Sequence, residues 1–346
     1  MTGDELQHSM TDIYFRFIQF SLGIYEGKEF LDGSALKDFD WWAFYEFAKK
    51  QTLVGVVFDG VRKLPKQTAP SFDLLMHWVA VSQKIKQSNN VLNEATVAIY
   101  NMVKAAGLPC CILKGQGNAV MYPDPLIRMP GDVDVWVDAS REEIRGLANS
   151  LVQKTNGNVD DESLNHIGLT MNGITVELHF TPGFMANFVY NKRLQRWLKQ
   201  NAGLQCSNMV ELPNDVGLVA VPTHTFNIVY QLYHLYHHYF YEGVGLRQVV
   251  DYYFVLVKSE ERRVKNSIVL QLQLHLFASS SNKAFEFFVL HSSFFTYLMN
   301  LARPSLSIAS TPSDVNVAPV TASTLFGSPA GASFSTPSAM PGTPSL

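Results

Sequence analysis

The chain carries at residues 128–137 the sequence RMPGDVDVWV, in which Asp132 and Asp134 stand two residues apart within an apolar, β-branched run. In a strand, residues i and i+2 project from the same face, so both carboxylates point the same way, about 7 Å apart along the chain. Two adjacent anions repel each other unless a cation neutralises them. A divalent ion such as Mg²⁺ does this, because it prefers carboxylate oxygens and completes its shell with water and substrate phosphates. The alternative for an isolated pair of this kind is a solvated strand end.

Three neighbouring features favour metal and phosphate binding over that alternative. An apolar run ends at Lys114-Gly115, where glycine lets backbone amides approach a phosphate closely and lysine adds positive charge. Arg128 lies just upstream of the acidic pair, and a guanidinium can hold a phosphate through two parallel hydrogen bonds. Glu177 lies in a later strand-like run. A glycine turn, an acidic pair on one strand and a third acid on a later strand are the outline of a two-metal nucleotidyl-transfer site.

The chain resembles the polymerase-beta-like nucleotidyltransferase superfamily, and within it an uncharacterised bacterial nucleotidyltransferase family. Four blocks carry the resemblance, namely LKG at 113–115, YPDP at 122–125, RMPGDVD at 128–134 and ELH at 177–179. Residues 245–251 resemble the family's helical block after the core, so the resemblance runs from residue 41 to residue 257. The wider superfamily has Gly-Ser or Gly-Gly at the turn, whereas this chain has Gly115-Gln116.

The resemblance implies transfer of a nucleoside monophosphate from a nucleoside triphosphate to a hydroxyl of an unidentified acceptor, for which the net charge favours a small molecule or a protein. It implies Mg²⁺ or Mn²⁺ as cofactor and Asp132, Asp134 and Glu177 as catalytic residues and metal ligands. The nucleotide-binding residues that it implies are Lys114, Gly115, Gln116 and Arg128. His179, two residues after Glu177 on the same strand face, is either a partner of that carboxylate or a packed strand histidine.

A second interpretation is that the chain has the nucleotidyltransferase fold but no catalytic activity. Gln116 at the turn and the unusual C-terminal sequence favour a catalytically inactive nucleotide-binding or protein-interaction module. The complete set of Asp132, Asp134 and Glu177 argues against this alternative, because three converging carboxylates are costly to keep without a cation.

Composition narrows the function further. The 346 residues include 47% hydrophobic and 12% aromatic residues, enough to bury substantial cores. The formal net charge of −3 leaves no basic footprint for long nucleic acid. Three cysteines suggest no disulfide framework, and the N-terminus has no signal-peptide pattern. We therefore expect a cytoplasmic protein that binds no membrane; the oligomeric state is not predicted.

Periodic patterns predict an α+β fold. Helical spacing dominates before residue 106 and after residue 181, whereas residues 107–180 alternate between strands and helices. We expect a small mixed sheet that forms the nucleotidyltransferase core, flanked by N-terminal and C-terminal helical regions and followed by a disordered tail. The expected regions are 1–88 (N-terminal helical), 89–180 (core), 181–262 (C-terminal helical) and 263–346 (tail).

Some motifs have simpler explanations than a functional site. Asp38-Phe39-Asp40 precedes a helical pattern, so it predicts a helix N-cap. The turn at 115–120 lacks the third glycine of a dinucleotide-binding fingerprint, which argues against that fold. His234 and His238, with His237 between them, have a spacing that can bind zinc on a helix. Packed and hydrogen-bonded histidines, substrate contacts and metal ligands all remain open for this cluster.

The C-terminal stretch is poor in charge. From residue 268 onward the charged residues are Lys283, Glu286, Arg303 and Asp314, and the chain past Arg303 is mainly Ser, Thr, Pro, Ala and Gly. Such a composition cannot bury a core. The two explanations are an altered reading frame and a genuine disordered tail, and neither predicts a catalytic residue there.

Overall fold

The computed structural model describes residues 3–241 and 243–258, so the predicted tail at 263–346 lies outside the described residues. The helices are α1 (Gly3–Ser21), α2 (Lys28–Leu31), α3 (Trp41–Lys50), α4 (Val54–Val61), α5 (Phe72–Ala105), α6 (Gln116–Ala119), α7 (Arg141–Thr155), α8 (Phe188–Gln205), α9 (His224–Tyr241) and α10 (Leu246–Val257). Short 3₁₀ turns are η1 (Ser34–Leu36), η2 (Pro125–Ile127) and η3 (Pro213–Asp215). The strands are β1 (Cys110–Ile112), β2 (Val133–Val137), β3 (Asn158–Glu162), β4 (His166–Met171), β5 (Ile174–His179), β6 (Met209–Leu212) and β7 (Gly217–Ala220).

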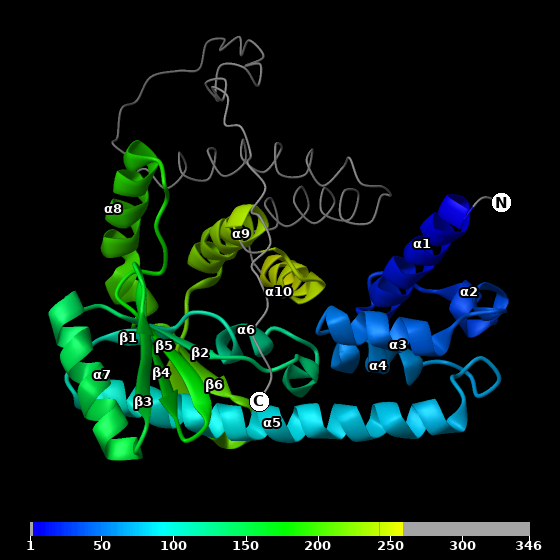
Figure 1. Cartoon of the computed structure of the whole chain (residues 1–346), viewed down its shortest axis with the longest axis horizontal. Coiled ribbons are helices and arrows are strands. Elements are labelled where there is room, and N and C mark those ends of the chain that lie inside the picture. Colours follow the sequence, from blue (N-terminus) through cyan, green and yellow to red (C-terminus); the bar gives the residue numbers. More distant parts are fainter. Residues whose placement is uncertain (1–2, 242, 259–346) are drawn as a thin grey trace, which may run out of the picture. The chain divides into compact units, whose positions relative to one another are not determined.

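A five-stranded mixed sheet in the order β1-β2-β5-β4-β3 forms the core of the fold (Figure 1). The β2 and β5 strands are parallel, and the other three neighbouring pairs are antiparallel. In the parallel pair Asp134 is the partner of Glu177, so the two acidic strands are direct neighbours. The predicted α+β fold with a small mixed sheet is confirmed.

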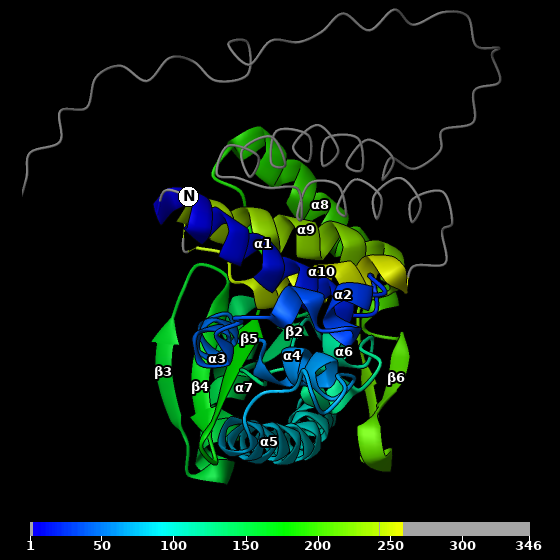
Figure 2. The same ribbon diagram turned by 90° about the vertical axis from the view of Figure 1, so that its right-hand side faces the viewer.

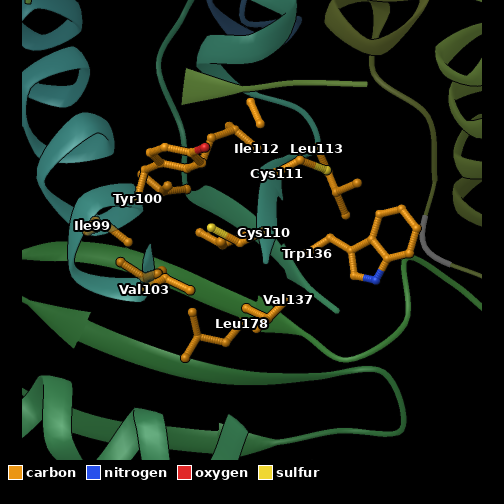
Figure 3. Packing of buried hydrophobic residues seen from close by; sticks show 14 of the residues in the cluster. Ile99, Tyr100, Val103, Cys110, Cys111, Ile112, Leu113, Trp136, Val137 and Leu178 are labelled. Atoms are coloured by element: carbon orange, nitrogen blue, oxygen red, sulfur yellow. The ribbon is translucent and has the colours of Figure 1, made fainter. Parts of the chain in front are cut away.

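Side-chain alternation gives the sheet one apolar face. Figure 3 shows Cys110, Val137 and Leu178 from three strands beside Ile99 and Val103 of α5. The α7 helix packs beside β3 and β4, and its Ser140 N-cap and Glu143 form the reciprocal capping box. Because residues i and i+1 of a strand face opposite ways, burying the apolar positions here sends the acidic positions of β2 and β5 to the other face. Figures 1 and 2 show α5 on one side of the sheet and α9 on the other.

A second core joins the helices from the two ends of the described chain. It contains Phe17 and Phe44 from the N-terminal helices, Trp78 of α5 and Val255 of α10. The Trp78 indole N–H donates to the Val54 carbonyl at 3.1 Å, so its one polar atom is satisfied. The α5 helix runs without a break across residue 88, where sequence analysis places a regional boundary, and it contributes to both cores.

Several local expectations can be compared with the structure. The Asp40 carboxylate accepts from the Ala43 backbone N–H at 2.9 Å, which confirms the N-cap. Region 181–262 is not purely helical, because β6 and β7 form a hairpin whose strands have four residues each, too short for a clear alternation signal. All three cysteines are free and buried. None of the helices described within 3–241 and 243–258 combines the length and apolar character that a membrane span requires.

A buried ion pair fastens α10 to the loop before β2. Asp251 of α10 accepts from Arg128 Nε and Nη2, both at 2.8 Å, and from the Tyr122 hydroxyl at 2.6 Å. Only 4% of Arg128 is exposed. Burial opposes the guanidinium charge, but Asp251 outweighs burial and raises the pKa of Arg128 above its usual value. Two of the four blocks that carry the family resemblance, and the helical segment 245–251, therefore meet in one structural contact.

We expect Asp251→Asn to lower the free energy of unfolding by about 3–5 kcal/mol, because it leaves the Arg128 guanidinium buried without a counter-charge. Chemical denaturation with urea measures this change. The matched control is Glu162→Gln, which removes an exposed carboxylate that pairs with Arg141 and Arg145 and should have a much smaller effect. Equal losses in the two variants would contradict the structural importance of the buried pair.

Candidate active site

The turn after β1 brings a lysine to the acidic strand. The Leu113 N–H donates to the Asp134 carbonyl at 3.0 Å, which holds the turn beside β2. Gly115 has φ 52° and ψ −116°, and a Cβ at this position would lie 3.1 Å from the Asp132 carbonyl oxygen. Both the positive φ and the close approach favour glycine. The Lys114 ammonium then lies 2.9 Å from Asp134 Oδ1.

Three carboxylates converge beside this lysine. Asp132 directly precedes β2, Asp134 lies within it, and Glu177 lies opposite Asp134 on β5. One carboxylate oxygen from each residue lies within 4.8 Å of the others. The structure therefore brings together the three residues that strand periodicity and the family resemblance single out, while their catalytic roles stay a prediction.

The two aspartates differ electrostatically. Asp134 is 1% exposed, and burial opposes its ionisation, but Lys114 and His179 outweigh burial and hold its pKa below the ordinary value. The pKa of Asp132 is instead raised, first by the neighbouring Asp134 charge and then by burial. One carboxylate is thus compensated within the protein, whereas ionisation of the other is opposed by its acidic neighbour and by burial.

Two histidines lie next to the carboxylates on the same sheet face. His179 Nε2 lies 3.0 Å from Asp134 Oδ1 and 3.1 Å from Glu177 Oε2, so of its two interpretations the contact with Glu177 is present, and it extends to Asp134. Burial opposes a charge on His179, but the hydrogen bonds with both carboxylates raise its pKa. His166 of β4 is the register partner of His179, and its Nδ1 lies 3.7 Å from Glu177 Oε2.

Sequence analysis did not identify His166, although a local signal points to it. Asn172 and Gly173, with φ 50° and 78°, form the tight turn between β4 and β5. Asn-Gly is the sequence typical of a two-residue hairpin turn, which fixes the register of the flanking strands. Counting back from this turn pairs His166 with His179.

Two predicted nucleotide-binding residues do not point to the carboxylates. The Arg128 guanidinium is paired with Asp251 within the second core, and its role as a phosphate ligand stays a prediction. Gln116 is 3% exposed, and its amide donates to Asn89 at 3.4 Å and to Asn93, both on α5. Its side chain therefore belongs to a buried amide network, and its predicted contact with nucleotide stays a prediction.

A second arginine, which sequence analysis passed over, lies near the acidic segment. Arg247 of α10 donates to the Met129 carbonyl at 3.4 Å, and a Cβ on Gly131 would lie 3.6 Å from its Nη1. Within the described part of the chain, no carboxylate lies within ion-pair distance of Arg247. Burial first, and then the charge of Arg128, lower the pKa of Arg247, and the charges of Asp251 and Asp132 offset this only in part.

The histidines of α9 contact each other. His234 Nε2 and His238 Nε2 are 3.0 Å apart, which supports the hydrogen-bonded interpretation of this cluster. Burial, and then the charge of Lys114, hold the pKa of His234 well below its ordinary value, so its ring is neutral beside the site. Among the residues that the structure describes, the side-chain groups arranged for a metal ion do not include the α9 histidines.

Comparison with known proteins places the chain in a family. The profile of a family described as "uncharacterised nucleotidyltransferase" matches residues 37–280, which extends past residue 257, where the resemblance was expected to end. No curated protein sequence matches the chain. One similar solved structure is an antigenic nucleotidyltransferase-like protein from Paracoccidioides brasiliensis, with 14% identity and a TM-score of 0.33 over 53% of this chain and 87% of that one. On the extent of the family match, the chain belongs to the uncharacterised nucleotidyltransferase family.

Proposed function

We propose that this protein is a metal-dependent nucleotidyltransferase that moves a nucleoside monophosphate from a nucleoside triphosphate to a hydroxyl of an acceptor. The observation that carries the proposal is the meeting of Asp132, Asp134 and Glu177 beside Lys114. Membership of the nucleotidyltransferase family supports the reaction class. Neither the family nor the arrangement of these residues favours the non-catalytic alternative.

The donor set fits a divalent cation. Three carboxylates meet here with one lysine, and the raised pKa of Asp132 is the sign of an anionic charge that the protein does not compensate. Asp132, Asp134 and Glu177 would hold Mg²⁺ or Mn²⁺, because carboxylate oxygens are the ligands that these ions prefer. When bound, the cations would polarise the α-phosphate and neutralise charge on the entering and leaving oxygens.

The other residues position the reactants. Lys114 and Arg247 attract the triphosphate, and Gly115 keeps the turn close to the Asp132 backbone. Glu177 orients the acceptor hydroxyl and takes its proton while the hydroxyl oxygen attacks the α-phosphorus. Pyrophosphate leaves from the opposite side. Catalysis then depends mainly on positioning and on charge that is already in place.

The acceptor is proposed only by class. The net charge of −3 disfavours long nucleic acid, which leaves a small molecule or a protein side chain. Buried free cysteines fit a reducing compartment, so a cytoplasmic location stays a prediction.

The proposed function is tested by incubating the protein with triphosphates labelled at the α-phosphate, Mg²⁺ or Mn²⁺, and cell lysate. We expect label to move to a lysate component only when a divalent ion is present. Asp132→Asn should lower this transfer by about 10²-fold or more, because an electrostatic partner of the transition state is lost. Transfer at the wild-type rate in Asp132→Asn would contradict the assigned site.

The two aspartates should affect the stability of the metal-free protein in opposite directions. Asp132→Asn should raise the free energy of unfolding by about 0.5–2 kcal/mol, because it removes an anion whose ionisation Asp134 opposes. Asp134→Asn should lower it by about 3–5 kcal/mol, because Lys114 loses its buried counter-charge. Urea denaturation in chelator measures both values, and a gain in both variants would rule out compensation by Lys114.

Substitutions of Arg247 and Arg128 should have different effects, the first on nucleotide binding and the second on the stability of the fold. Arg247→Gln should weaken triphosphate binding by about 10–100-fold, the effect of losing a charged hydrogen-bond donor, with little change in stability. Arg128→Lys should instead destabilise the fold, because lysine cannot reproduce the two-pronged contact with Asp251. Calorimetric titration with a non-hydrolysable triphosphate measures the affinity.

The charge-matched control is Arg62→Gln, which removes an exposed arginine paired with Asp59. Equal triphosphate affinity in Arg247→Gln and in this control would exclude Arg247 from the site.

A further inference from the structure

Glu177 also belongs to a second group of possible metal ligands, which lies on β5 and its neighbour β4, away from the β1 edge of the sheet. His166 and His179 are direct partners across β4 and β5, and Glu177 shares their face. Glu177 Oε2 lies 3.1 Å from His179 Nε2 and 3.7 Å from His166 Nδ1. One donor atom from each of the three residues lies within 4.8 Å of the others. These spacings suit ligands of a single ion, whose bonds to nitrogen and oxygen are about 2.0–2.2 Å long.

The surroundings of His166 resemble those of a metal-bound histidine. Ligand histidines usually direct their second ring nitrogen at a carboxylate, which fixes the ring. Here Asp161 Oδ2 lies 4.0 Å from His166 Nε2, on the side of the ring opposite Glu177. Gly168 makes room for this carboxylate, because a Cβ at that position would lie 2.1 Å from Asp161 Oδ1. His166 Nδ1 faces Glu177 at 3.7 Å and also lies 3.1 Å from the Ser163 hydroxyl, so an ion bound at Nδ1 would replace the contact with Ser163.

We propose that His166, Glu177 and His179 form a second cation site, which selects a first-row transition ion such as Zn²⁺ or Co²⁺ over Mg²⁺. Imidazole nitrogen suits these ions, whereas Mg²⁺ prefers oxygen ligands. Glu177 is shared with the all-carboxylate group of Asp132 and Asp134, so the two sites are adjacent and chemically different. This inference rests on the proposed function for a cation at Asp132 and Asp134, but ion binding at the histidines is measured without any reaction.

The competing explanation is that His179 only donates hydrogen bonds to Asp134 and Glu177. In that case His166 contributes no ligand, and removing it leaves ion binding unchanged. The two explanations therefore differ at His166, which contacts Glu177 but is absent from the ion pairs of Asp134.

The experiment is a titration of the full chain with Co²⁺ in excess Mg²⁺, followed by visible absorption of the bound Co²⁺. We expect the wild-type protein to bind Co²⁺ under these conditions. His166→Gln should weaken Co²⁺ binding by at least about tenfold, since even the loss of an outer partner costs about 10–100-fold. Asp161→Asn, at a side chain that is 65% exposed, should weaken it to a smaller extent without threatening the fold.

Two controls make the result specific. His77→Gln removes a histidine that contacts Tyr45 in the helical region and should leave Co²⁺ affinity unchanged. Thermal melting of each metal-free variant verifies that it is folded. Equal Co²⁺ affinity in wild type and His166→Gln, or complete displacement of Co²⁺ by Mg²⁺, would overturn the proposal. Co²⁺ binding that depends on His166 in a protein without transfer activity would uphold this site while contradicting the proposed function.

Discussion

The buried carboxylate of Asp134 is the constraint on which the site depends. An ionised group that is 1% exposed needs compensation inside the protein, and Lys114 and His179 supply it at 2.9 and 3.0 Å. Lys114 lies beside Asp134 because the Leu113 N–H bonds to the Asp134 carbonyl, and Gly115 turns the chain directly after the lysine. His179 reaches it because β2 and β5 are parallel neighbours. The fold therefore fixes the position of Asp134 through groups of the protein itself, and the proposed catalysis would use a carboxylate that is already held in place.

A second buried pair links this site to the helices. Asp251 neutralises Arg128, and the Met129 carbonyl accepts from both Arg128 and Arg247. The α10 helix thus holds the loop that leads into Asp132. Arg128 is paired with Asp251 inside the protein, whereas Arg247 lies near the acidic segment. A family-typical arginine next to an acidic motif need not contact substrate, because it can hold the element that does.

Sequence periodicity predicted the local features of the site, but it could not predict contacts between residues that are distant in the sequence. Asp132 and Asp134 share a face because any strand alternates, so no tertiary information was needed. Arg128 and Asp251 are 123 positions apart, and no local pattern could show that they pair. His166 lies between these cases. The Asn-Gly turn fixes its pairing with His179, but only for a reader who first assumes that the two flanking segments form a hairpin.

Diffraction from crystals grown with Mn²⁺ and a non-hydrolysable nucleoside triphosphate tests the central claim most directly, because the anomalous signal locates the ion independently of the protein. The account predicts Mn²⁺ in contact with Asp132, Asp134 and Glu177, and a triphosphate that contacts both the ion and Lys114. A triphosphate bound elsewhere, or an ion that touches none of the three carboxylates, would contradict it.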